Sequence, residues 1–217
     1  MTVALSVVGK SDVGKTTLLE KLLPEIKRRG YRVATIKHDV HGFSIDLPGK
    51  DSWRHTQAGS DITVISSAEK VALVRKVDHE LTLNEIAHLI GSSVDLVMTE
   101  GFKRGPWPKI EVHRKAMGAE LLCTERELVC IATDEPIPMD VPQFDINDAA
   151  GIVDLIEQRF LKSQVGQGEV RLTVNGAIVP LKPFVQDMMA NAITGMVAAL
   201  RDTDNAREIE IIIKAAH

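Results

Sequence analysis

Apolar residues in this chain of 217 residues fall into short runs that alternate with stretches of helical spacing. Residues 3–8 form an almost unbroken apolar run, interrupted only by Ser6, as expected for a strand buried on both faces. Leu18, Leu22 and Ile26 then recur at the spacing of one helical stripe. This alternation predicts a doubly wound α/β domain with a mostly parallel sheet. Further strands are predicted over residues 32–37, 62–65, 71–74, 95–99 and 128–132, and helices from the capping pair Thr82 and Glu85 onward and over residues 145–161.

The end of the chain predicts a small separate module. Residues 163–168 are polar and contain glycine, which is typical of a linker. Asn175-Gly176 lies between two apolar runs and is a strong hairpin signal. We therefore expect a main domain over residues 1–163, and a linker with an α+β interaction module over residues 164–217. Its expected ββαβ elements are strands over 170–174, 177–179 and 209–213, and a helix from Pro183 to about residue 200.

Composition and charge exclude several classes of protein. Hydrophobic residues make up 44% and charged residues 26% of the chain, close to the globular average, so wholesale disorder is excluded. No apolar run reaches the roughly 18 residues that span a bilayer, and the N-terminus lacks the features of a signal peptide. The net charge of −4 and the lack of a basic tail argue against nucleic-acid binding. Cys123 and Cys130 are the only cysteines, so we expect no disulfide framework. Together these features predict a cytoplasmic protein that does not bind membranes.

The strongest functional motif follows the first predicted strand. Residues 9–16, GKSDVGKT, match GxxxxGK[ST] at every fixed position. Glycines let backbone N–H groups turn inward around phosphate oxygens, and the start of the following helix adds partial positive charge. In such a P-loop Lys15 reaches the β- and γ-phosphates, and Thr16 ligates Mg²⁺. The expected nucleotide-binding residues are Gly9, Lys10, Ser11, Asp12, Val13, Gly14, Lys15, Thr16 and Thr17.

Lys10 within this loop allows two interpretations. It is either a second lysine that reaches phosphate, as in the deviant P-loops of dimeric NTPases, or an exposed side chain without that role.

Acidic side chains follow two other predicted strands. Glu100 comes directly after one strand, where P-loop enzymes place the carboxylate that holds Mg²⁺. Asp39 follows another strand and is a candidate to assist the metal or to position a water. The alternatives are a surface carboxylate for Glu100 and an ordinary loop turn for Asp39. Zinc binding by His38, Asp39 and His41 is less favoured, because no cysteine is near and the spacing matches no common zinc pattern.

Two further residues are candidates for ligand contact. Lys50 lies in the turn-rich segment 46–52, where it would offer a charge to an anionic ligand. Asp134 follows a strand, in a position where P-loop GTPases often place a carboxylate that accepts the N1 and N2 hydrogens of guanine. No NKxD sequence is present, so a simple turn remains the alternative for Asp134.

Residues 101–115 form the one basic segment. Gly105-Pro106-Trp107-Pro108 within it is incompatible with a regular helix or a central strand. A tryptophan on a stiff loop among cations would suit a flat ligand that carries phosphate, or a partner protein. The alternative is a solvated loop with Trp107 folded onto the core. The basic residues are Lys103, Arg104, Lys109, Arg114 and Lys115, against one acid, Glu111.

The chain resembles the molybdopterin-guanine dinucleotide biosynthesis protein B family over roughly residues 1–162. The resemblance implies a GTP-binding, weakly hydrolysing protein that uses Lys15, Glu100 and Asp39 with Mg²⁺. It further implies a homodimer that acts mainly as an adaptor for the guanylyltransferase that joins GMP to molybdopterin. The basic segment would then suit the pterin phosphate, through Lys103, Arg104, Trp107 and Lys109, or a negatively charged partner. Beside the P-loop, the residues that carry the resemblance are 35–39, 46–52, 58–59, 95–103, 109–111, 133–134 and 145–148.

Two other functions compete with this one. An ATP-dependent kinase or ligase of the dethiobiotin-synthetase type shares the P-loop and would select ATP. A metal-delivery GTPase would need a ligand set rich in cysteine or histidine, for which His38 and His41 are the only candidates near the loop. No catalytic glutamine or arginine finger is assigned by the sequence, so strong turnover is not expected.

Overall fold

The computed structural model describes residues 3–39, 42–43, 45–91, 93–162, 170, 172–174, 177–201, 203 and 209–213. The chain divides into two compact units, one of residues 2–161 and one of residues 162–217 together with residue 1. Among the described residues, no helix has both the length and the apolar character that crossing a bilayer requires.

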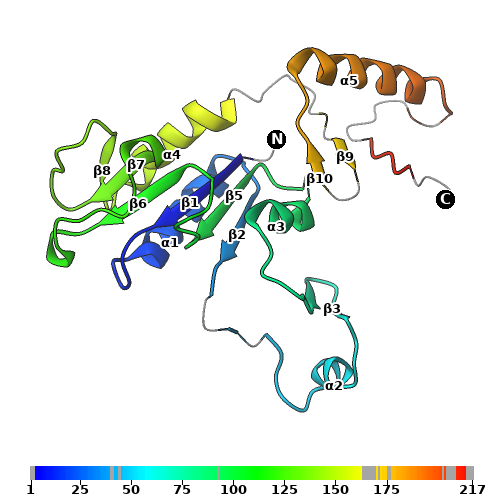
Figure 1. The fold of residues 1–217 in the computed structure, drawn as a ribbon, viewed down its shortest axis with the longest axis horizontal. Helices are drawn as coiled ribbons and strands as arrows, with labels where there is room; N and C mark the ends of the chain where they lie inside the picture. Colours follow the sequence, from blue (N-terminus) through cyan, green and yellow to red (C-terminus); the bar gives the residue numbers. More distant parts are fainter. Residues whose placement is uncertain are drawn as a thin grey trace. The chain divides into compact units, whose positions relative to one another are not determined.

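The first unit is built on a six-stranded sheet in which neighbouring strands run parallel (Figure 1). β1 (Val3–Val8) lies inside this sheet, and its side chains are almost all buried, as its unbroken apolar pattern predicts. The strand order is β2 (Val33–Lys37), β5 (Leu96–Glu100), β1, β6 (Lys109–His113), β7 (Leu128–Thr133) and β8 (Gln143–Asp145).

Helices cover both faces of the sheet. α1 (Lys15–Arg28) and α4 (Ala149–Ile156) pack together on one face, where Leu22 and Ile152 join a fully buried core with Leu5. α3 (Leu83–Ile90) packs on the other face through Leu83 and begins with the predicted capping box of Thr82. The predicted doubly wound α/β fold is therefore confirmed. In such a fold the carboxyl ends of the parallel strands meet at one edge, where ligands bind.

Two of the predicted strands form a hairpin instead of joining the parallel sheet. β3 (Ile62–Ser66) and β4 (Val71–Arg75) pair only with each other, antiparallel. The short connection between them explains this, because parallel neighbours need a crossover of a dozen or more residues. α2 (Asp51–Gln57) packs on β3, where the Thr56 and Thr63 hydroxyls lie 2.9 Å apart. Residues 45–77, which contain α2, β3 and β4, are called the hairpin lobe below.

The sequence pattern missed β6. Its polar side chains are buried, and each has a partner: the Glu111 carboxylate accepts hydrogen bonds from the backbone N–H groups of Leu122 (2.7 Å) and Cys123 (3.0 Å). The Nε2 of His113 lies 3.2 Å from Glu135 Oε1. A charged strand of this kind is stable in the interior because these polar groups are satisfied there.

The predicted closing helix begins later than expected. Asp145, its predicted first residue, ends β8, and α4 begins after Asp148, whose side chain accepts a hydrogen bond from the Gly151 N–H (2.9 Å). A wider turn over Glu157–Leu161 continues the helix to its predicted end. The sequence pattern did not reveal β8, because Asp145 and Asp148 are both residues that suit the start of a helix.

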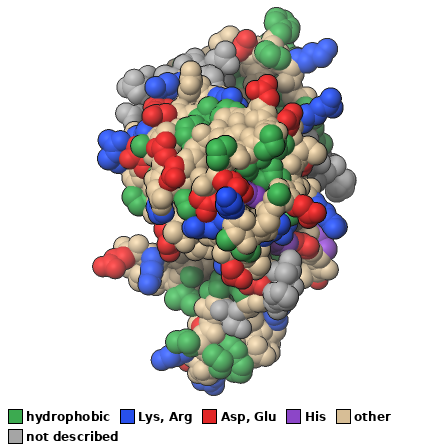
Figure 2. All heavy atoms as spheres, turned by 90° about the vertical axis from the view of Figure 1, so that its left-hand side faces the viewer, with side chains coloured by type: hydrophobic (Ala, Val, Ile, Leu, Met, Phe, Trp, Pro, Cys, Tyr) green, Lys and Arg blue, Asp and Glu red, His purple; other side chains and the backbone are tan. Residues whose placement is uncertain are grey.

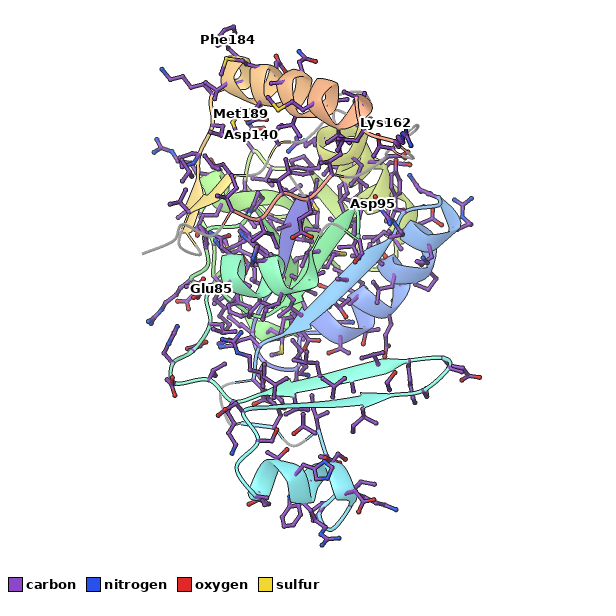
Figure 3. All side chains as sticks on the ribbon, turned by 90° about the vertical axis from the view of Figure 1, so that its right-hand side faces the viewer. Glu85, Asp95, Asp140, Lys162, Phe184 and Met189 are labelled. Atoms are coloured by element: carbon purple, nitrogen blue, oxygen red, sulfur yellow. The ribbon has the colours of Figure 1, made fainter. Side chains whose placement is uncertain are left out.

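The second unit contains the predicted hairpin strands and helix. β9 (Leu172–Val174) pairs antiparallel with β10 (Ala177–Val179), and α5 spans Pro183–Ala198. Phe184, 76% exposed, projects outward from the first turn of α5 (Figure 3). The prediction of a last strand over residues 209–213 is wrong, because these residues adopt no regular structure and pair with no described strand. The predicted linker segment 163–168 and turn Asn175-Gly176 lie outside the described residues.

Candidate functional site

The loop that follows β1 is built tightly against the end of β6. Gly9 has a φ of +150°, and a Cβ atom there would lie 2.6 Å from the carbonyl oxygen of Val112 and 2.8 Å from Val13 Cγ1. Gly14, with a φ of +106°, caps the start of α1. Only glycine fits both conditions without strain. The glycines of the motif therefore let the loop turn tightly against the end of β6 at the start of α1, as a loop that binds phosphate through backbone N–H donors requires.

Lys15 lies inside this loop. Its Nζ donates hydrogen bonds to the carbonyl oxygens of Lys10 (2.7 Å) and Gly9 (3.4 Å). Burial lowers the pKa of the Lys15 ammonium, and Glu100 opposes that shift. The nearby charges of Lys103 and Lys37 lower the same pKa further. Asp12 raises it, as Glu100 does, so the environment holds both signs of charge, and it is the partial burial of the ammonium that favours an anionic ligand at this position.

Thr16 and Glu100 come together although they are 84 residues apart. The Thr16 hydroxyl lies 2.9 Å from each oxygen of the Glu100 carboxylate. Lys37 Nζ lies 3.6 Å from Glu100 Oε1. β5 delivers the carboxylate to this point because it is the direct neighbour of β1. A hydroxyl beside a carboxylate is an oxygen ligand pair that suits Mg²⁺.

The Lys10 side chain contacts the turn that follows β6. Its Nζ donates a hydrogen bond to the carbonyl oxygen of Met117 (2.7 Å). Met117 ends the short turn Lys115–Met117 that follows β6. Of the other predicted loop residues, Ser11, Asp12 and Thr17 are exposed and Val13 is buried.

Asp134 is part of a basic arrangement beyond β7. Its Oδ1 accepts a hydrogen bond from the Lys115 backbone N–H (2.8 Å), and its Oδ2 lies 3.9 Å from Arg114 Nη1. Arg114 Nε in turn donates to the carbonyl oxygen of Val13 in the P-loop (3.0 Å). From the sequence, Arg114 was predicted only as part of the basic segment. Its position directly after a buried strand was the missed signal, since β6 itself was not predicted.

The structure brings Lys50 and Asp39 less directly into this site. Lys50 precedes α2 in the hairpin lobe, which lies apart from the end of β1 in Figures 1 and 3. Asp39 is exposed two residues beyond β2. The role of Asp39 with the metal remains a prediction. His41 lies outside the described residues, and no group of three potential metal ligands among His, Cys, Asp and Glu occurs in the described part of the chain.

Two of the four residues that were predicted to contact the pterin phosphate are buried. Trp107 is 9% exposed and packs in the core on the α3 face, where its Nε1 donates to Asn84 Oδ1 (3.2 Å). Lys109 is 2% exposed, and its Nζ donates to Glu127 Oε1 (2.9 Å). The prediction that these two residues contact molybdopterin is wrong in this structure, because burial and pairing remove them from the surface. Lys103 and Arg104 remain exposed.

The charged side chains on the face drawn in Figure 2 do not form a broad basic area. Acidic and basic side chains are intermixed on the face drawn in Figure 2. A nucleic-acid surface instead gathers cations over a broad area.

Glu127→Gln should reveal the contacts of the Glu127 carboxylate with Thr124 and Lys109 as a pH-dependent loss of stability. The backbone N–H of Thr124 and then the Lys109 ammonium lower the pKa of Glu127 from 4.5 to about 2. A carboxyl group with a lowered pKa stabilises the fold above pH 4.5, and this stability is lost as the pH falls toward 2. We expect the wild type to unfold at a higher temperature than the variant at pH 7, with the gap closing below pH 4.5. A gap independent of pH would contradict these contacts, and exposed Glu120→Gln is the control.

Fold and loop together define a P-loop NTPase-like α/β protein. The family model of molybdopterin guanine dinucleotide synthesis protein B matches residues 4–134, and the chain belongs to this family. A molybdopterin-guanine dinucleotide biosynthesis adapter protein of Haemophilus influenzae is 40% identical over 154 residues, which cover 70% of this chain and 86% of that protein.

Two further comparisons extend the match. A putative adapter protein of the same description from Methanocaldococcus jannaschii is 29% identical over 236 aligned positions and covers 96% of each chain. A crystal structure of molybdopterin-guanine biosynthesis protein B matches with a TM-score of 0.60 and 32% identity, covering 72% of this chain and 97% of that one. The match to the Methanocaldococcus jannaschii protein therefore extends into the second unit, residues 162–217.

Proposed function

We propose that this chain is a cytoplasmic Mg-GTP-binding adapter in molybdopterin-guanine dinucleotide biosynthesis. The contact of Thr16 with Glu100, beside the partly desolvated Lys15, is the observation that carries the proposal. A GxxxxGK[ST] loop with these neighbours has the donors for phosphate and the oxygen ligands for Mg²⁺. The adapter role is supported by the family and by the names of the relatives.

Each site residue has a separate task in this proposal. Lys15 and the inward N–H groups of the loop hold the phosphates, and Thr16 and Glu100 hold Mg²⁺. The metal would supply charge neutralisation at the phosphate oxygens. Asp39 orients a water molecule for slow hydrolysis. We expect hydrolysis to be weak. These residues would hold the phosphates, the metal and the water in place, but none is assigned to activate the water strongly.

Asp134 selects the base. The hydrogen bond from the Lys115 N–H fixes one oxygen of its carboxylate. A fixed carboxylate at the end of β7 accepts the N1 and N2 hydrogens of guanine, which adenine does not offer. GTP is therefore the proposed nucleotide.

The partner is the guanylyltransferase that joins GMP to molybdopterin. Exposed Lys103 and Arg104 offer cations to the pterin phosphate or to a negatively charged partner surface. The second unit is proposed as a separate interaction module, with the boundary between domains at about residue 163. Its α5 carries Phe184, Met188 and Met196 at 54–76% exposure, and contiguous exposed apolar side chains are typical of an interaction surface.

The hairpin lobe is the proposed homodimer interface. Ile62 and Val64 on β3 and Val71 and Leu73 on β4 are 49–66% exposed. Val64 pairs directly with Leu73, on the face opposite the buried Thr63. A two-stranded hairpin with an open apolar face is marginal in water, so a second copy of this face is a suitable cover.

Titration calorimetry with GTP and ATP, with and without Mg²⁺, tests the nucleotide site. We expect the wild type to bind GTP more tightly than ATP, with a gain in affinity from Mg²⁺. Glu100→Gln should lose the gain from Mg²⁺, because it removes one ligand charge beside Thr16. Asp134→Ala should lose the preference for GTP, and exposed Glu69→Gln is the control. Preference for ATP in the wild type would overturn the proposal in favour of a kinase or ligase.

A further inference from the structure

Arg114 places a guanidinium group against the P-loop from a distant part of the chain. It directly follows β6, and its Nε donates a hydrogen bond to the carbonyl oxygen of Val13 (3.0 Å). A Cβ atom built on Gly14 would lie 3.5 Å from Arg114 Nη2 and 3.8 Å from Nε. The guanidinium therefore lies beside the start of α1, one residue before Lys15.

The other end of this group faces the residues beyond β7. Arg114 Nη1 lies 3.9 Å from Asp134 Oδ2, longer than a hydrogen bond, and the Arg114 side chain is 40% exposed. Arginine carries five N–H donors in a rigid fork. The bond to Val13 uses the Nε donor, and it fixes the plane of the fork. The Nη groups thus lie between the phosphate loop and the carboxylate proposed to select the base.

We propose that Arg114 binds the phosphate chain of the nucleotide directly, on the side of the chain that faces Asp134. This inference rests on the nucleotide site proposed above. A planar guanidinium donates two parallel hydrogen bonds to phosphate oxygens in a fixed geometry, which an ammonium group lacks. Lys15 approaches from inside the loop through the carbonyls of Lys10 and Gly9. Arg114 approaches beside Gly14, so the two cations hold the phosphates from different directions.

The proposal differs from two structural roles of the same side chain. Arg114 would only stabilise the conformation of the loop if its bond to Val13 were its whole contribution. It would act only on base selection if it did no more than orient Asp134. A direct phosphate contact predicts an effect that does not depend on the base, whereas the second role predicts an effect seen with GTP alone.

Calorimetry with Arg114→Ala separates the phosphate contact from the orienting role. Thermal unfolding without nucleotide separates it from stabilisation of the loop, since only the loss of the bond to Val13 should lower the unfolding temperature. The probes are Mg-GTP and inorganic triphosphate with Mg²⁺, which has no base. We expect affinity for both to fall by a similar factor of roughly 10- to 100-fold, since a hydrogen bond to a charged group is removed. The control is Arg32→Ala, which removes an arginine paired with Asp95 at 3.3 Å. Asp95 directly precedes β5 (Figure 3), at the opposite end of the strand from Glu100, so this variant should bind like the wild type.

The possible outcomes distinguish failure of the Arg114 contact from failure of the nucleotide site itself. Equal binding by wild type and Arg114→Ala overturns the arginine contact and leaves the nucleotide site intact. Loss with Mg-GTP but not with inorganic triphosphate also overturns it, in favour of orienting Asp134. A wild type that binds neither probe overturns both proposals. If the alanine variant does not fold, Arg114→Lys replaces it. Lysine keeps the charge without the fork, so affinity for both probes should still fall, and unchanged affinity would overturn the contact.

Discussion

Replacing Lys15 by alanine is expected to weaken Mg-GTP binding by about 100-fold, because two charge-assisted hydrogen bonds of about 1.5 kcal/mol each are lost. Lys15 Nζ is already held inside the loop by the carbonyls of Lys10 and Gly9. Burial lowers its pKa, so the ammonium gains more from an anion here than on the open surface. Titration calorimetry of wild type and variant measures the loss directly.

The matched control is Lys27→Ala. Lys27 is an exposed lysine in the last turn of the same helix, so both variants remove one lysine from α1. Thermal unfolding without nucleotide should be similar for both, because in the described part of the chain the Lys15 side chain donates its hydrogen bonds to the loop carbonyls of Lys10 and Gly9. A Lys15→Ala protein that binds Mg-GTP like the Lys27→Ala protein would show that the loop does not hold the phosphates.

The conformation of the phosphate loop could be predicted from local sequence. The P-loop motif sets its own turn, since the glycines and the following helix are adjacent in the chain. The meeting of Thr16 with Glu100 was expected because each follows a strand of one parallel sheet. That topological rule needs no knowledge of side-chain partners. It therefore succeeded across 84 residues of separation.

The parts that depend on distant partners were not predicted. Lys109 and Glu111 look like surface charges in sequence, because charged residues are rarely buried unless they are paired. Their partners come from elsewhere: Glu127 for Lys109, and the backbone of Leu122 and Cys123 for Glu111. Without those contacts β6 resembled a loop. The same error hid the strand-end position of Arg114, whereas the burial of Trp107 is the alternative that the sequence had left open.

The substitution Leu73→Glu is expected to convert the proposed homodimer to monomers. Leu73 is 58% exposed and faces Val64 across the hairpin. In a two-fold dimer each lobe covers the same face of its mate, so one substitution changes the interface twice. The variant removes apolar burial and introduces two carboxylates into a desolvated contact, where unpaired charges are strongly disfavoured. Sedimentation equilibrium at several protein concentrations measures the change in mass.

Leu89→Glu distinguishes this effect from a general cost of surface charge. Leu89 lies on α3 and is 56% exposed, close to the exposure of Leu73, but it is outside the hairpin lobe. This variant should stay dimeric. The phosphate loop and its metal ligands come from β1, α1 and β5, so the Leu73→Glu monomer should still bind Mg-GTP. A wild type that is monomeric at all concentrations, or a Leu73→Glu protein that stays dimeric, would exclude the hairpin lobe as the interface. A monomer that cannot bind nucleotide would show instead that the partner completes the site.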